Sequence, residues 1–158
     1  MNLFLLNILL AAGWMLLNGH YASSDFVIGF IVGFFALSLT RPSSDRPSYG
    51  RKFWAAIKLI LVFFYHLITS SLQVVWDVLT PTHLSRPAII KIPLDVSSDM
   101  EIMLLANIVS LTPGSLTLDV SDDRKYLIVH AMFSHDEQSV IDEIKSTFEA
   151  RILEITRD

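Results

Sequence analysis

Two apolar stretches near the start of the chain decide its fold class: residues 3–17 read LFLLNILLAAGWMLL and residues 26–39 read FVIGFIVGFFALSL. The polar residues 18–25 separate them, so the pattern predicts a helical hairpin. Each arm has about 15 to 17 apolar residues, fewer than the roughly 20 that cross a 30 Å hydrocarbon core. We therefore expect short, tilted or incompletely spanning arms.

The second arm carries two glycines at a spacing that suits helix packing. Gly29 and Gly33 lie four residues apart, and such a small-xxx-small pair lets another helix approach the backbone closely. The simplest use of this pair is closure of the hairpin itself.

Composition divides the chain into two domains. Of 158 residues 52% are hydrophobic and 18% are charged, with a mean hydropathy of +0.49, which is too apolar for an ordinary soluble domain. Residues 1–80 are predicted to be membrane-embedded, with helices at about 3–18, 25–40 and 53–79, whereas residues 81–158 have the composition of a small extramembrane α/β domain. The first part has a net charge of +2 and the second −6. An acidic domain argues against nucleic-acid binding.

The third apolar segment, residues 53–79, is long enough to span but has a polar side. At 100° per residue its polar side chains fall on one third of the circumference. We call these residues the polar stripe: Lys58, His66, Thr69, Ser70, Gln73 and Asp77. Three interpretations are open for the stripe: contact with partner subunits, a helix lying partly in the membrane interface, and a proton or cation relay.

The relay interpretation depends mainly on one residue. Lys58 and Asp77 lie near the ends of the segment, where long or terminal charged side chains reach the interface at little cost. His66 is thus the only titratable group expected at depth.

Basic residues orient the predicted membrane helices. The connector 41–52 carries Arg41, Arg46, Arg51 and Lys52, so the positive-inside rule places it in the cytoplasm. Three spanning segments would then put the C-terminal domain outside the cell.

The C-terminal part shows alternating strand and helix signals. A β-type run at 89–94 is followed by a capping box, Ser98 to Glu101, that begins a helix ending near Ser110. Pro113 and Gly114 predict a type II turn. Residues 115–120 and 126–133 predict an antiparallel hairpin, and a second capping box at 134–137 opens a final helix. The order β-α-β-β-α predicts a small ferredoxin-like α+β domain that lacks its last strand.

The sequence has none of the usual catalytic motifs: no GxGxxG, Walker-type loop, HExxH or GxSxG is present. There is also no cysteine, which excludes disulfides and thiolate ligands. His135, Asp136 and Glu137 resemble a metal site, but capping explains acids in the first turn of a helix. We therefore predict no catalytic residue, metal or cofactor, and no enzyme activity.

One stretch is more specific than its composition requires. Residues 105–119, LANIVSLTPGSLTLD, resemble the signature of the E subunit of the bacterial Mrp-type multisubunit cation/proton antiporters. The resemblance extends over nearly the whole chain. Its motif positions, with no catalytic role attached to any, are Asn107, Thr112, Pro113, Gly114, Thr117 and Asp119.

The resemblance implies an accessory subunit of a complex that exchanges Na⁺ or K⁺ for protons. Its partners would be the other antiporter subunits and the bilayer of the bacterial cell membrane, in a multi-pass arrangement. The resemblance places the C-terminal domain on the cytoplasmic side, against the simple charge rule, and we favour that placement. If the 112–115 turn also contacts a subunit, Asn107 and Thr112 are the expected contacts. The alternative function is a membrane-anchored binding or sensor domain outside any antiporter.

Overall fold

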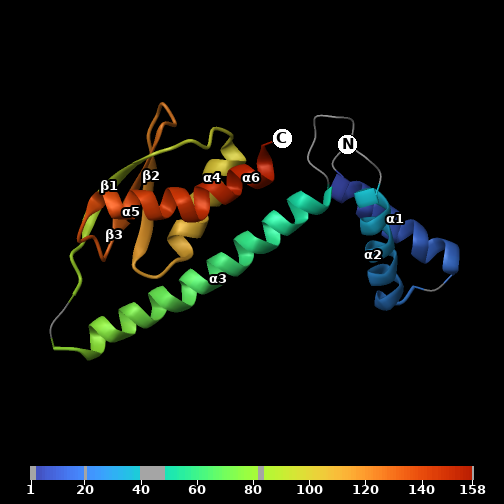
Figure 1. Ribbon diagram of the computed structural model, residues 1–158, viewed down its shortest axis with the longest axis horizontal. Helices are drawn as coiled ribbons and strands as arrows, with labels where there is room; N and C mark the ends of the chain where they lie inside the picture. The colour runs from blue at the N-terminus through green and yellow to red at the C-terminus, as the bar shows by residue number, and fades with distance from the viewer. Residues whose placement is uncertain (1–2, 20, 40–48, 82–83, 158) are drawn as a thin grey trace. The chain divides into compact units, whose positions relative to one another are not determined.

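The computed structural model describes residues 3–19, 21–39, 49–81 and 84–157. Contacts divide the chain into two compact units, one that ends at Trp54 and one that runs from Ala55 to Arg157 (Figure 1). Arg41 and Arg46, which belong to the predicted basic connector, lie outside the described residues.

The first unit contains the predicted hairpin. Helices α1 (Leu3–Asn18) and α2 (Ser23–Leu39) pack against each other. A Cβ atom on Gly29 would lie 2.7 Å from Trp14 Cβ and 3.0 Å from Ala11 Cα. A Cβ on Gly33 would collide with the Asn7 side-chain oxygen. Both glycines therefore allow the backbone of α2 to approach α1.

Helix α3 (Tyr49–Leu79) begins a turn earlier than the sequence predicts and has 31 residues. Within the described part of the chain, it is the one helix whose length and composition suffice to cross a membrane. The arms α1 and α2 are apolar but shorter.

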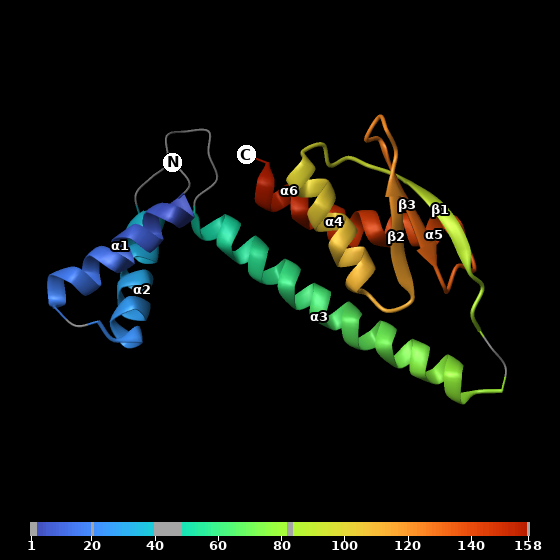
Figure 2. The same cartoon turned by 180° about the vertical axis from the view of Figure 1, so that it is seen from behind.

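The second unit contains a three-stranded antiparallel sheet in the order β1-β3-β2 (Figures 1 and 2). The element order along the chain agrees with the predicted β-α-β-β-α. The bounds are β1 (Ala88–Pro93), α4 (Asp99–Leu111), β2 (Ser115–Val120), β3 (Tyr126–Ala131), α5 (Glu137–Ile144), η1 (Lys145–Glu149) and α6 (Ala150–Thr156).

The hydrophobic core lies between one face of this sheet and the helices. Alternate residues of β3, Leu127 and Val129, are fully buried, as are Leu105 of α4 and Ile152 of α6. Leu59 of α3 belongs to the same core cluster. The opposite face of the sheet exposes apolar side chains such as Ile89.

Two helix starts test the predicted capping boxes. The first prediction is confirmed, because the Ser98 side chain accepts from the Glu101 N–H while Glu101 accepts from the Ser98 N–H. The second is wrong, because α5 is capped by Asp136, whose carboxylate accepts from the N–H groups of Gln138 and Ser139. A carboxylate at this position interacts favourably with the helix dipole. The Ser134 N–H instead donates to the Arg86 carbonyl at 3.1 Å.

The last helix is continuous but contains one π-helical turn, η1. This wider turn admits an extra residue, so that the adjacent residues Phe148 and Glu149 are both buried. Phe148 follows the apolar i, i+4 spacing from Ile144 to Ile152, whereas nothing in that spacing indicates a buried Glu149.

Candidate functional site

The motif that carries the family resemblance forms the corner between α4 and β2. Thr112 is the C-cap of α4, and the Ser115 N–H donates to the Thr112 carbonyl at 3.2 Å. Gly114 has a φ of 88°, a conformation that glycine adopts without strain. The expected glycine in the positive-φ position of the turn is confirmed.

Side chains of the motif fasten the start of β2 to the end of α4. The Thr117 hydroxyl donates to the Ala106 carbonyl at 3.1 Å, and the Ser115 hydroxyl donates to the Val109 carbonyl at 2.7 Å. The buried Thr112 hydroxyl donates to Ile108 within α4. Thr112 and Thr117 thus have structural roles in the domain. Asp119 accepts from the Val120 N–H where the β2 ladder shifts register.

Asn107, in contrast, is exposed and belongs to an exposed side of α4. Its neighbours at helical spacing are apolar, and the sequence does not predict their exposure because apolar residues occur on both the buried and the exposed side of this helix. We call the following residues the α4 face: Met100, Met103, Leu104, Asn107 and Leu111, whose apolar members are 37% to 70% exposed.

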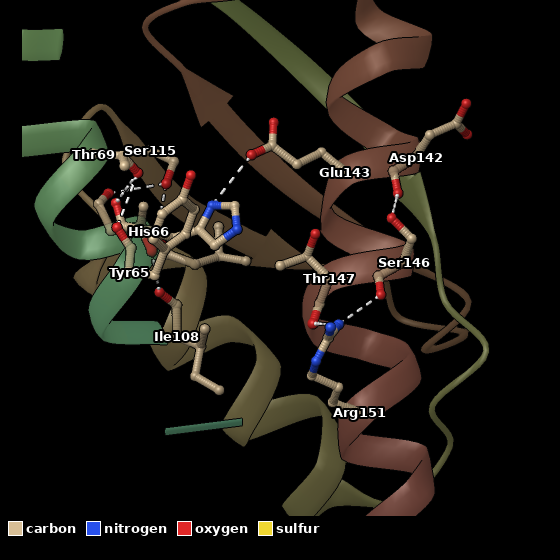
Figure 3. A network of polar contacts seen from close by, with 12 residues as sticks. Tyr65, His66, Thr69, Ile108, Ser115, Asp142, Glu143, Ser146, Thr147 and Arg151 are labelled. Carbon is tan, nitrogen blue, oxygen red and sulfur yellow. Dashed lines mark hydrogen bonds and ion pairs between the residues drawn. The ribbon is translucent and has the colours of Figure 1, made fainter. Parts of the chain in front are cut away.

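His66 of the polar stripe lies against the last helix (Figure 3). Its Nδ1 is 3.4 Å from Glu143 Oε1, and its ring meets the Phe148 ring edge-on at 5.3 Å between centroids. The imidazole therefore joins α3 to α5 and η1 by one polar and one aromatic contact.

Other stripe residues also meet the domain. Ser70 and Gln73 line a cavity of about 110 Å³ whose far wall includes Thr112 and Gly114. Asp77 is 2% exposed, and its carboxylate accepts from the N–H groups of Leu84 and Ser85 in the segment that leads to β1.

Lys58 and Thr69 complete the stripe. Thr69 is exposed, and its hydroxyl donates to the Tyr65 carbonyl of its own helix, whereas Lys58 is exposed at the edge of the stripe. His66 and Asp77 are separated by about 16 Å of helix axis, so the structure does not bring the proposed relay residues into contact.

A second polar cluster, which the sequence did not predict, surrounds Glu149. Its Oε1 accepts from the N–H groups of Asp95 and Val96, and its Oε2 lies 3.1 Å from Lys145 Nζ. Burial opposes the charge on Lys145, but hydrogen bonds to Asp95 and Glu149 outweigh it and raise the Lys145 pKa. This cluster joins the segment after β1 to the π-helical turn.

Ionisable side chains could also form a metal site if they converged. Among residues 3–19, 21–39, 49–81 and 84–157, no group of three or more His, Cys, Asp or Glu residues has the arrangement to hold a metal ion.

An apolar hairpin, a long amphipathic helix and a small acidic α+β domain define a membrane-associated protein. The chain belongs to the family described as Na⁺/H⁺ ion antiporter subunit, which matches residues 7–155.

Named relatives align over nearly the whole chain. The chain is 40% identical to the E subunit of the Na⁺/H⁺ antiporter of Alkalihalophilus pseudofirmus over 153 residues, 97% of each chain. It is 36% identical to the protein of the same name from Bacillus subtilis, again over 97% of each chain.

Two solved structures resemble the fold. A chain of the Mrp complex from a Dietzia species is 27% identical, with a TM-score of 0.51 over 63% of this chain and 93% of that chain. A chain of the archaeal membrane-bound sulfane sulfur reductase, 24% identical, matches 96% of this chain and 98% of its own length with a TM-score of 0.60. The second likeness concerns the fold alone.

Proposed function

We propose that this chain is the E subunit of a multisubunit antiporter that exchanges Na⁺ or K⁺ for protons. Its role is accessory: it supports assembly and stability of the complex and is a transporter component rather than an enzyme. The family match over residues 7–155 supports this function. The ionisable clusters at Glu149 and Asp77 support the accessory role, because each fastens parts of this domain to one another.

The observation that carries the proposal is the α4 face. Its apolar side chains recur at i, i+3, i+4 and i+11, the spacing by which a helix docks into an apolar groove. Met103 is 61% exposed and Leu111 is 62% exposed. Asn107, a motif position, lies among them and can both donate and accept hydrogen bonds. We therefore assign the α4 face as a contact with a neighbouring subunit. Of the two contact residues expected from the sequence, Asn107 and Thr112, only Asn107 belongs to this face, because Thr112 is buried.

Only two residues of the polar stripe are proposed as subunit contacts. Lys58 and Thr69 stay candidates for subunit contact, because neither takes part in the contacts that join α3 to the domain. The other stripe residues face the chain's own domain.

We also propose that α1 and α2 cross the bacterial cell membrane and that the domain lies on the cytoplasmic side. Helices of 16 and 17 residues are about 24 to 26 Å long, so local thinning or neighbouring subunits would accompany them. Proteolysis of inverted vesicles, but not of right-side-out vesicles, should remove the domain. The β-α-β-β-α order supports a ferredoxin-like fold without its last strand.

The test of subunit contact uses the tagged chain expressed with its neighbouring antiporter subunits. Met103→Asp should reduce recovery of those subunits at least tenfold, and Asn107→Ala should reduce it less. Ile89→Asp is the matched control, because Ile89 is 65% exposed on the open face of the sheet. Vesicles with the Met103→Asp chain should also lose Na⁺-dependent proton exchange. Wild-type recovery with Met103→Asp would refute this contact, and a tagged wild-type chain that purifies alone would refute the function.

A further inference from the structure

Helix α3 has one side that the chain's own domain already covers. Leu59 is 7% exposed within the domain core, the His66 side chain is 19% exposed beside Glu143, and Asp77 is 2% exposed. At 100° per residue these three positions lie within about 20° of one another. The covered side therefore extends from the second turn of the helix in this unit to its last turn.

The opposite side of α3 is apolar and exposed. Its side chains fall within an arc of about 80°, centred roughly 180° from the covered side. We call these residues the α3 apolar face: Leu61, Phe64, Ile68, Leu72, Val75 and Leu79, which are 52% to 75% exposed.

The contacts of His66 argue against α3 as a spanning helix. His66 lies near the middle of Tyr49–Leu79, so a spanning α3 would hold it near the bilayer centre. Glu143, 3.4 Å from His66 with a side chain 58% exposed, would then face hydrocarbon. Charged side chains there are strongly disfavoured. The helix is also about 46 Å long, half as long again as the roughly 30 Å core.

Features of the same chain indicate lipid as the surface that covers the α3 apolar face. Only residues 40–48 separate the end of the membrane hairpin from the start of α3, which keeps that start near the membrane. Lys58, on the flank of the apolar face, can extend to anionic headgroups. Tyr65 and Trp76 are 64% and 63% exposed on α3 as well, and these residue types favour the membrane interface.

We propose that α3 lies along the membrane surface, with the α3 apolar face in the outer part of the lipid and the domain on its other side in water. This inference rests on the proposed function in one respect, which is that α1 and α2 anchor the chain in the membrane. Two crossings, rather than three, then put the domain on the same side as the basic connector. The charge rule and the family placement agree in this arrangement.

The absence of cysteine from the sequence makes a depth measurement direct. Leu61→Cys, Ile68→Cys and Val75→Cys, each in the full chain, would carry a nitroxide label in phosphatidylcholine/phosphatidylglycerol vesicles. Accessibility to oxygen and to a water-soluble nickel complex gives the depth of each label. Gln138→Cys, on the exposed side of α5, is the aqueous control.

A surface helix predicts one common depth, about 5 to 10 Å below the headgroup boundary, at all three positions. A spanning helix, centred near residue 64, would place Leu61 and Ile68 close to the bilayer centre and Val75 about 10 Å shallower than Ile68, since seven residues separate Val75 from Ile68. That result would overturn the proposal, as would nickel access equal to that at position 138. Loss of oxygen access when the neighbouring subunits are added would show that a protein covers the face, which also overturns it.

Sidedness gives an independent readout in the assembled complex. Ser44→Cys, in the connector, and Ser139→Cys, in the domain, should react with a membrane-impermeant maleimide from the same side. Reaction from opposite sides would overturn the proposal. The two proposals fail in different experiments. If the proposed antiporter function is wrong, no partner subunits will co-purify with the tagged chain. The depth measurement uses the purified chain without partner subunits, so it tests the position of α3 alone.

Discussion

Glu149 Oε1 accepts a hydrogen bond at 3.0 Å from the backbone N–H of Val96, a residue 53 positions earlier in the chain. The same oxygen accepts from the Asp95 N–H, and Lys145 pairs with the other carboxylate oxygen. Glu149 is 1% exposed. One carboxylate thus satisfies two backbone donors of the segment between β1 and α4.

Replacement of Glu149 should weaken the domain. Glu149→Ala removes the acceptor of two N–H groups and one partner of Lys145, so we expect a loss of about 2 to 3 kcal/mol in the free energy of unfolding. Urea unfolding of the full chain in detergent, followed by far-UV circular dichroism, measures this loss. Glu154→Ala, at an exposed position of the same helix, is the control and should change stability little. Equal effects of the two substitutions would contradict the role of Glu149.

Glu101 predicts how domain stability changes with pH. Hydrogen bonds to its carboxylate from the Thr156 hydroxyl and from the Ser97 and Ser98 N–H groups lower the Glu101 pKa from 4.5 to about 2. Because the folded-state pKa is below the unfolded one, this contribution is fully present above pH 4.5 and is lost as the pH falls toward 2.

The measurement compares the wild type with Glu101→Gln. The wild type should be the more stable at pH 7, and the difference in melting temperature should shrink steadily from pH 4.5 to pH 2. Asp99→Asn, in the same helical turn but at an exposed position, provides the control. A difference that stays constant over this range would show that the Glu101 charge is not the cause.

Local signals predicted the parts of the fold that depend on neighbouring residues. The capping box at Ser98 and the turn at Gly114 each arise from contacts within a few positions, so the sequence contains their cause. The sequence places the second cap at Ser134 rather than at Asp136, because both residue types suit the N-cap and no local pattern indicates the backbone hydrogen bond between Ser134 and Arg86.

Long-range contacts explain what the sequence did not predict. Glu149 is buried because a π-helical turn rotates it toward Val96, and no local pattern indicates such a turn. Helical periodicity predicts the polar stripe, but the surface that covers it depends on how the domain folds back onto His66. Exposure of the α4 face likewise depends on which side of α4 packs on β2.

A methyl group added at Gly29 or Gly33 should destabilise the hairpin of α1 and α2. Gly33→Ala would place a Cβ against the Asn7 side-chain oxygen, and Gly29→Ala would place one 2.7 Å from Trp14 Cβ. Each should destabilise the hairpin by about 1 to 3 kcal/mol, as overpacking does. Thermal unfolding in mild detergent, followed by size-exclusion chromatography, measures the effect.

Gly13→Ala is the control for both glycine substitutions. Gly13 lies in α1, and a Cβ there meets nothing within 4 Å in the described part of the chain. Because alanine favours a helix over glycine, this variant should be as stable as the wild type or slightly more stable. A hairpin that tolerates Gly33→Ala as well as Gly13→Ala would show that α1 and α2 are not closely packed at that point.

A buried amide inside the first unit leads to the last prediction. Asn7 is fully buried, and its side-chain nitrogen donates to the Tyr49 hydroxyl at 3.3 Å. Its side-chain oxygen has no hydrogen-bond partner among the residues that the structure describes. Asn7 is thus a polar tie between α1 and the first turn of α3.

Tyr49→Phe should therefore destabilise the hairpin, because it leaves the Asn7 amide unpaired in an apolar surrounding. Asn7→Leu removes the same bond, and the double variant should lose less than the two single losses added together. The coupling energy should be about 0.6 kcal/mol and no more than about 1.7 kcal/mol, as for other hydrogen bonds between membrane helices. Thermal unfolding of the four chains in one detergent gives this value. Strict additivity would mean that the Asn7 and Tyr49 side chains do not interact. The contact between the hairpin and the first turns of α3 would then depend on α2, through aromatic packing of Phe34 against Tyr49 and Phe53.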